Sequence, residues 1–187
     1  MRKVLAIAAA VVADAARRKV VWVVVVFAGI LAVAIPALPS YGEGVASAVF
    51  REVSIALMYT ASLVVALALS VLRIPSEVER RTVYNIVARD VRRWQYVVGT
   101  WTGMFAVLGL VIAAFTVATI GIGAFTYGEV MWRLIEASFA VWLEIGVIMA
   151  LAVMLSCSFG AVTSSVGALT FAFVGHAIVS LMNLPEG

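Results

Sequence analysis

Charged residues are scarce in this sequence. Of its 187 residues, 12% are Asp, Glu, Lys or Arg and 65% are hydrophobic, whereas soluble globular proteins average about 25% charged and about 45–50% apolar residues. The chain has one cysteine and one histidine. One cysteine excludes an internal disulfide, and a lone histidine does not supply the roughly four ligands that a zinc site takes. This composition indicates an integral membrane protein.

The short motifs of common catalytic sites are also missing. The sequence contains no glycine-rich phosphate-binding loop, no H-E-x-x-H and no G-x-S-x-G pattern. Nothing in it therefore predicts nucleotide hydrolysis, a zinc protease or a serine nucleophile. We expect the chain not to be an enzyme and to hold no metal or cofactor. Cys157 is interpreted as a small apolar residue in a helix.

Long apolar runs predict an all-α membrane protein. A helix needs about 20 apolar residues to cross about 30 Å of hydrocarbon, and the sequence offers five such runs in one domain, residues 1–187. We expect turn-rich sequence to form an external loop at 39–52, and Gly121 and Gly123 to loosen the outer end of the third span. The predicted spans cover about residues 20–38, 53–72, 96–120, 134–156 and 161–182.

The amino terminus allows two interpretations. A basic start, a short apolar run and Ala13-Asp14-Ala15 resemble a secretory signal with its cleavage site. Cleavage there would leave Arg17, Arg18 and Lys19 outside, against the positive-inside rule. We favour an uncleaved amphipathic helix at residues 3–18 that lies at the cytoplasmic interface. Its apolar face would comprise Val4, Leu5, Ala8, Val11, Val12 and Ala15.

The positions of Lys and Arg predict the orientation of the chain. Five lie at the amino terminus and six in the connection at 73–95, against Arg51 and Arg133 in the two loops on the other side. Because cytoplasmic loops carry an excess of Lys and Arg, the amino terminus and this connection are expected in the cytoplasm. The predicted location is the cytoplasmic membrane of a prokaryote.

The basic connection carries the pattern of an amphipathic helix. Pro75 disfavours continuation of the second span, and Ser76 with Glu79 three residues later forms a capping box that begins a new helix. Over residues 76–88 one face then gathers polar side chains and the other Val, Ile and Thr. A charged loop that only fixes topology and binds anionic lipids needs no such two-faced helix. The polar face comprises Glu77, Arg80, Arg81, Tyr84 and Asn85.

The residues S-E-V-E-R-R-T-V-Y at 76–84, Ala88-Arg89, and R-W-Q-Y-V-V-G at 93–99 resemble the first cytoplasmic loop of ABC-2 type transporter permeases. The likeness is closest to the branch associated with multi-copper enzyme maturation. Where that family commonly has Pro and Lys, this sequence has Asp90 and Thr100. The family normally has six spans after an interfacial helix, whereas five are predicted here, so a sixth would be missing or supplied by another chain.

The resemblance implies a permease subunit that exports a substrate while a separate cytoplasmic ATPase subunit binds ATP and magnesium. The connection would be the coupling helix that contacts this ATPase. The resemblance also implies a homodimer or heterodimer with a second permease, surrounded by membrane lipids, and no nucleic acid as a partner. The ATPase contacts would be Glu77, Glu79, Arg80, Arg81, Thr82, Tyr84, Asn85 and Arg89. The alternative is a non-transporting scaffold or assembly factor that recruits a cytoplasmic partner through the same loop.

Ionisable residues within the predicted spans need a separate explanation. A charge at mid-span costs about 2.5–3.5 kcal/mol on insertion scales, and Glu144 lies too deep for any basic residue of its own helix to reach it. Glu144 is interpreted either as a structural hydrogen-bonding residue or, with the lone His176, as part of a translocation path or gate. An intramembrane enzyme using Glu144, Ser164 or His176 is disfavoured because these residues are expected at different depths and so cannot converge within one protomer. For hydrogen bonds between helices, the second span offers Ser54, Thr60, Ser62 and Ser70.

Overall fold

The computed structural model describes residues 2–17, 26, 29–30, 43–79, 93–128, 131–159 and 161–182. The predicted first span, residues 20–38, lies outside the described residues apart from positions 26, 29 and 30. The described part of the chain folds into helices, as expected for an all-α protein. They are α1 (Arg2–Arg17), α3 (Glu43–Glu79), α5 (Arg93–Tyr127), α6 (Arg133–Ser158) and α7 (Ala161–Met182).

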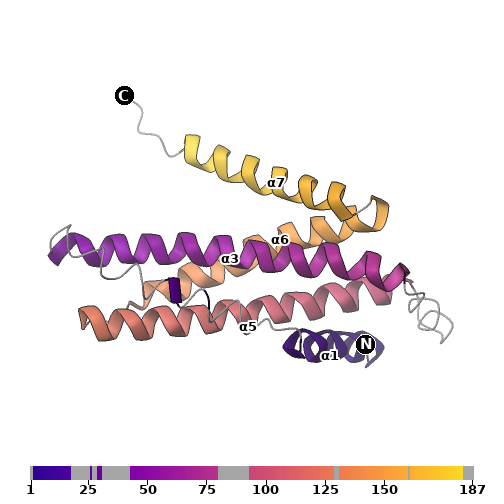
Figure 1. Ribbon diagram of the computed structural model, residues 1–187, viewed down its shortest axis with the longest axis horizontal. Coiled ribbons are helices and arrows are strands. Elements are labelled where there is room, and N and C mark those ends of the chain that lie inside the picture. The colour runs from indigo at the N-terminus through magenta and orange to yellow at the C-terminus, as the bar shows by residue number, and fades with distance from the viewer. Residues whose placement is uncertain are drawn as a thin grey trace.

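The four longer helices run along one common direction (Figure 1). Helices α3 and α5 lie side by side and antiparallel, α6 packs against both, and α7 contacts α6 and α3 before leaning away towards its carboxyl end. The short α1 packs on α5. Helix α1, the end of α3, the start of α5 and the turn between α6 and α7 all lie at one end of the bundle. The predicted topology likewise places the amino terminus and the basic connection on one side.

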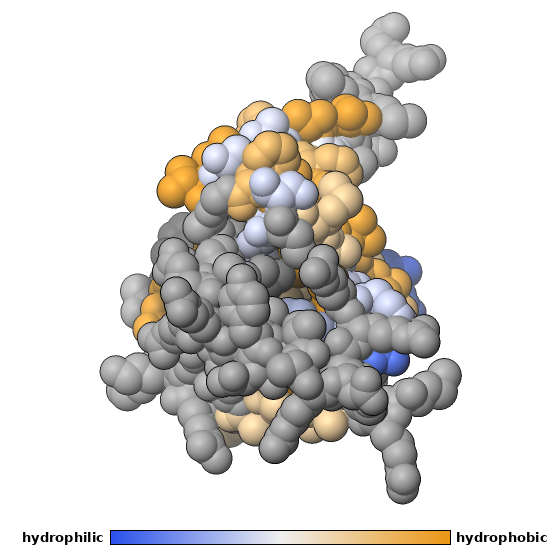
Figure 2. All heavy atoms as spheres, turned by 90° about the vertical axis from the view of Figure 1, so that its right-hand side faces the viewer, coloured by the Kyte–Doolittle hydropathy of each residue, from blue (hydrophilic) through white to orange (hydrophobic). Residues whose placement is uncertain are grey.

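Three of these helices contain segments long and apolar enough to cross a membrane: Ser47–Ser70 in α3, Trp94–Thr126 in α5 and Arg133–Ser156 in α6. Their presence indicates a membrane protein. Helix α7 has the bounds predicted for the fifth span and holds a shorter apolar segment, Val162–Ile178. Hydrophobic side chains are also exposed on the outside of the bundle, as Figure 2 shows at the end where α6 turns into α7. Exposed examples are Val147, Met154, Val162, Val166 and Phe173.

Helix α3 differs from the sequence prediction at both ends. It begins at Glu43, ten residues before the predicted start and within the expected external loop, because Phe50 is buried in the core and extends the apolar face of the helix towards its amino end. It also continues through Pro75 to Glu79. The predicted break at Pro75, with a new helix capped by Ser76, is therefore wrong. A proline removes one backbone N–H donor, and the many remaining hydrogen bonds of a 37-residue helix keep it continuous.

Helix α5 also exceeds its predicted length. It passes through Gly121 and Gly123 and ends at Tyr127, because Gly123 is buried in the packing of the helix: an added Cβ there would lie 3.4 Å from the ring of Phe50. The helix ends where Gly128 adopts a φ of 71° and donates its backbone N–H to the carbonyl of Ala124. Glycine takes this left-handed conformation without steric cost.

The core lies between α3, α5 and α6. On α3, a stripe at steps of four residues alternates apolar side chains with serines. The small serines leave room for neighbouring helices. Fully buried members of the core include Phe50, Met104, Leu108, Phe115, Ile145 and Met149, and the stripe comprises Phe50, Ser54, Met58, Ser62, Ala66 and Ser70.

The hydroxyl groups of α3 do not bridge helices as predicted. Thr60 and Ser70 donate to the carbonyls of Ala56 and Ala66 in their own helix, at 2.8 and 2.6 Å. The oxygens of Ser54 and Ser62 are buried, with no hydrogen-bond partner among the described residues. At positions 54 and 62 the side chains are small and lie buried in the bundle.

Glycines allow two close approaches between helices. Gly103 of α5 lies against α1, so close that an added Cβ would be 2.6 Å from Cβ of Val11 and 2.9 Å from the carbonyl oxygen of Ala8. Both α1 residues belong to its predicted apolar face. At Gly146 of α6, an added Cβ would clash with the ring of Phe105. That ring stacks between Trp101 and Trp142, at centroid distances of 5.1 and 4.3 Å.

Replacement of Gly103 by alanine tests the contact between α1 and α5. The added methyl group meets the backbone of Ala8, which cannot yield easily, so we expect Gly103→Ala to lower the free energy of unfolding in detergent by about 1–2 kcal/mol. Gly121→Ala is the matched control on the same helix, because nothing lies within 4 Å of its added Cβ. The control should match the native protein or exceed it by up to about 1 kcal/mol. Equal stability of the two variants would contradict the observed packing of α1.

Candidate functional site

Three helices meet in a small apolar interface. Its members are spaced four residues apart on each helix: Leu63 and Leu67 on α3, Ile148 and Ala152 on α6, and Ala168 and Ala172 on α7. One further turn along each helix, towards the same end of the bundle, lies a residue that can ionise: position 59 on α3, 144 on α6 and 176 on α7. The apolar interface therefore continues into a polar layer formed by Tyr59, Glu144 and His176.

Tyr59 is the centre of this polar cluster. Its hydroxyl donates a hydrogen bond to Oε1 of Glu144 at 3.1 Å. Its ring also contacts the imidazole of His176, with 5.6 Å between ring centroids and 35° between ring planes. Tyr59 is half-buried, whereas Glu144 and His176 are exposed on the surface of the bundle. Because Tyr59 and Glu144 lie at the middle of the apolar segments Ser47–Ser70 and Arg133–Ser156, this polar cluster sits at mid-span.

From the sequence, Glu144 and His176 were selected separately and were expected at different depths in the membrane. That expectation is wrong. Helices α6 and α7 form an antiparallel hairpin with a turn at Phe159. Glu144 precedes this turn by 15 residues and His176 follows it by 17, so the two reach a similar depth. Counting outward from the turn would have shown this in the sequence. Ser164 does not join them, because it lies 12 residues before His176, about 18 Å along α7.

Tyr59 was not predicted as a site residue. A tyrosine in an apolar run is an ordinary packing residue, and its type alone gives no reason to select it. What distinguishes Tyr59 is its position along α3 relative to the apolar interface. Tyr59 lies four residues before Leu63, as Glu144 lies four residues before Ile148, and only the helix packing relates these two positions to each other.

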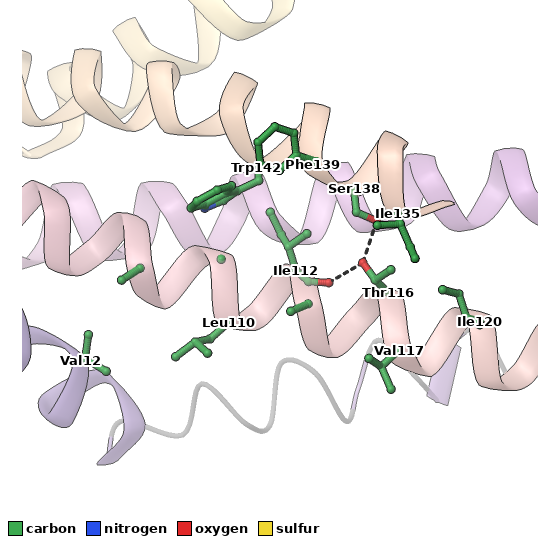
Figure 3. A pocket seen from close by; sticks show the side chains of 13 residues that line it. Val12, Leu110, Ile112, Thr116, Val117, Ile120, Ile135, Ser138, Phe139 and Trp142 are labelled. Atoms are coloured by element: carbon green, nitrogen blue, oxygen red, sulfur yellow. Dashed lines mark hydrogen bonds between the residues drawn. The ribbon is translucent and has the colours of Figure 1, made fainter. Parts of the chain in front are cut away.

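A pocket of about 680 Å³ lies on the opposite side of α6 (Figure 3). It is open to the surface between α5 and α6, and Val12 of α1 closes one end. Trp142 and Glu144, two positions apart, point about 160° apart around α6, so the pocket and the polar cluster use opposite faces of one helix. Larger side chains around the pocket include Leu110, Val117, Ile120, Ile135, Phe139 and Trp142.

The few polar atoms of the pocket are already hydrogen-bonded. Thr116 donates to Ser138 at 2.7 Å and lies 2.8 Å from the carbonyl oxygen of Ile112, while Ser138 contacts the carbonyl of Leu134. The indole N–H of Trp142 donates to the carbonyl of Phe105 at 3.1 Å. With these groups satisfied, the pocket presents an apolar surface and suits a hydrocarbon chain or ring of moderate size.

The predicted ATPase contacts cannot be placed. Arg80, Arg81, Thr82, Tyr84, Asn85 and Arg89 lie outside the described residues, and for Glu77 and Glu79 the structure describes only the helical backbone at the end of α3.

No protein family, curated protein or solved structure was found to match the chain. The functional assignment therefore depends on the residues themselves and on their arrangement.

A double-mutant cycle tests the hydrogen bond between Tyr59 and Glu144. We expect the unfolding free energies of Tyr59→Phe, Glu144→Gln and the double variant in detergent to give a coupling energy of about 0.6 kcal/mol, the average for hydrogen bonds between helices in membranes. Glu136, which is exposed on the same helix, provides the control. Tyr59→Phe combined with Glu136→Gln should be additive. Additivity in both cycles would mean that the hydrogen bond contributes nothing.

Proposed function

We propose that the chain is the membrane-spanning permease subunit of an ABC-2 type transporter. In this role a separate cytoplasmic ATPase binds the connection at 73–95, and ATP hydrolysis in that subunit drives export of a substrate. The permease works as a homodimer or heterodimer in the cytoplasmic membrane of a prokaryote, with its amino terminus in the cytoplasm. The proposed family follows from the resemblance of residues 76–99.

The polar cluster is the observation that carries this proposal over the scaffold alternative. Glu144 lies at mid-span and joins two other ionisable side chains from neighbouring helices. Ionisable residues are costly in a membrane and generally mark a pathway for an ion or a substrate. A scaffold that recruits a partner through its cytoplasmic loop has no need of a carboxylate at that depth.

The continuity of α3 supports a coupling role for the connection that follows it. Its 37 residues extend over about 55 Å at 1.5 Å per residue, well beyond a hydrocarbon core of about 30 Å. The helix carries Tyr59 at mid-span and passes without interruption to Glu79, at the start of the predicted ATPase contacts. A displacement at the ATPase would therefore reach the polar cluster through one rigid element.

Affinity purification of the tagged protein in mild detergent, followed by mass spectrometry, tests the proposed partnership. An ATP-binding-cassette ATPase in roughly equal amount is the expected result. A different membrane or cytoplasmic protein in its place, with no ATPase, would favour the scaffold.

Charge reversal tests the predicted contact. We expect Arg80→Glu combined with Arg81→Glu to weaken stimulation of the partner's ATPase activity about tenfold or more, because opposite charges in the contact become like charges. Arg133→Glu is the matched control, since Arg133 is exposed at the start of α6, at the other end of the bundle. The control should insert and stimulate normally. Undiminished stimulation by the double variant would exclude this docking role.

A further inference from the structure

The carboxylate of Glu144 has unused capacity to accept hydrogen bonds and no basic neighbour on its own helix. An ionised carboxylate offers about four acceptor positions, and among the described residues one of them is filled, by the hydroxyl of Tyr59. Arg133 lies 11 residues away on α6, about 16 Å along the axis. On α3, Arg51 lies eight residues before Tyr59 and is 3.9 Å from Glu52. Within the described parts of these two helices, no Lys or Arg neutralises Glu144.

The aromatic rings beside Glu144 restrict which kind of cation could neutralise its carboxylate. The rings of Tyr59 and His176 are in contact, with 5.6 Å between their centroids and 35° between their planes. In general, an aromatic face attracts a cation held within about 6 Å of the ring centroid. A metal ion prefers several oxygen, nitrogen or sulfur ligands, and the described residues contain no group of three His, Cys, Asp or Glu. One carboxylate combined with aromatic rings instead suits an organic cation. The charge of such a cation is weakly hydrated and needs no shell of ligands.

The surroundings suit the apolar part of such a molecule. Val147 follows Glu144 by three residues and Phe173 precedes His176 by three, so each lies on the same side of its helix as the polar cluster. Their side chains are 62% and 76% exposed. A cation with hydrocarbon substituents could therefore place its charge at Glu144 and its substituents against these apolar side chains.

We propose that Tyr59, Glu144 and His176 bind the charged group of a lipophilic organic cation. Glu144 supplies the opposite charge, and the rings of Tyr59 and His176 supply aromatic faces. This inference deepens the proposed function by naming its substrate class, and rests on that function for transport. Binding itself requires no ATPase subunit, so it is measured on the full chain alone.

Equilibrium binding of tetraphenylphosphonium to the purified protein in detergent tests the site. We expect Glu144→Gln, which keeps the shape of the side chain and removes its charge, to weaken binding at least tenfold. Glu136→Gln removes the same charge two turns away on α6 and should bind as the native protein does. Equal affinities of all three proteins would overturn the proposal, because the probe would then be partitioning into apolar surface.

Two substitutions at Tyr59 separate the ring from the hydroxyl. Tyr59→Phe retains the aromatic face and should weaken binding by no more than about threefold, whereas Tyr59→Leu removes the face and should weaken it about tenfold. Equal affinities of these two variants would exclude an aromatic contribution. Far-UV circular dichroism and gel filtration identify any variant that fails to fold. His176→Leu then replaces the misfolded variant in the test. We expect it to bind the cation about threefold or more weakly, and native affinity would count against the site.

The outcomes distinguish this inference from the proposed function. Co-purification of an ATPase without charge-dependent binding of the cation would leave a transporter with another substrate. Charge-dependent binding without an ATPase would leave a cation site in a protein that is not an ABC-2 permease.

Discussion

Polar groups in an apolar layer are costly unless they find partners inside the protein. This constraint shapes the described helices, although the buried hydroxyls of Ser54 and Ser62 have no hydrogen-bond partner among the described residues. Thr116 and Ser138 satisfy it by pairing across α5 and α6, and Thr60 and Ser70 by bonding to their own backbone. Tyr59 and Glu144 satisfy it only in part, since the carboxylate remains exposed. An incompletely satisfied group in a layer where such groups are expensive is the clearest sign of function in this molecule.

Hydropathy predicted most of the helices, and tertiary packing decided where they end. Helices α6 and α7 have nearly their predicted bounds because the polar turn between them is short and distinct. The start of α3 was missed because the burial of Phe50 outweighs a turn-rich sequence before it. The helix break at Pro75 was predicted from local preferences, those of Pro75 and of the capping box formed by Ser76 and Glu79, which a long helix overrides.

The site was predictable in part, for a similar reason. Glu144 and His176 stand out by residue type, because ionisable residues are rare in apolar runs. Their shared partner depends on the relative register of α3, α6 and α7, which side-chain packing sets at Leu63, Ile148 and Ala172. The pocket between α5 and α6 left no trace in the sequence, because its lining differs little from the apolar residues elsewhere in the same helices.

The stack of Trp101, Phe105 and Trp142 gives the contact between α5 and α6 an optical property of its own. Two indole rings lie on either side of one phenyl ring, with interplanar angles of 10° and 15°. Near-UV circular dichroism is sensitive to aromatic rings held in fixed packing, and Trp142 of this stack also lines the pocket. Any movement that separates the two helices would change that spectrum, so the protein carries an intrinsic reporter of its conformation and needs no attached label.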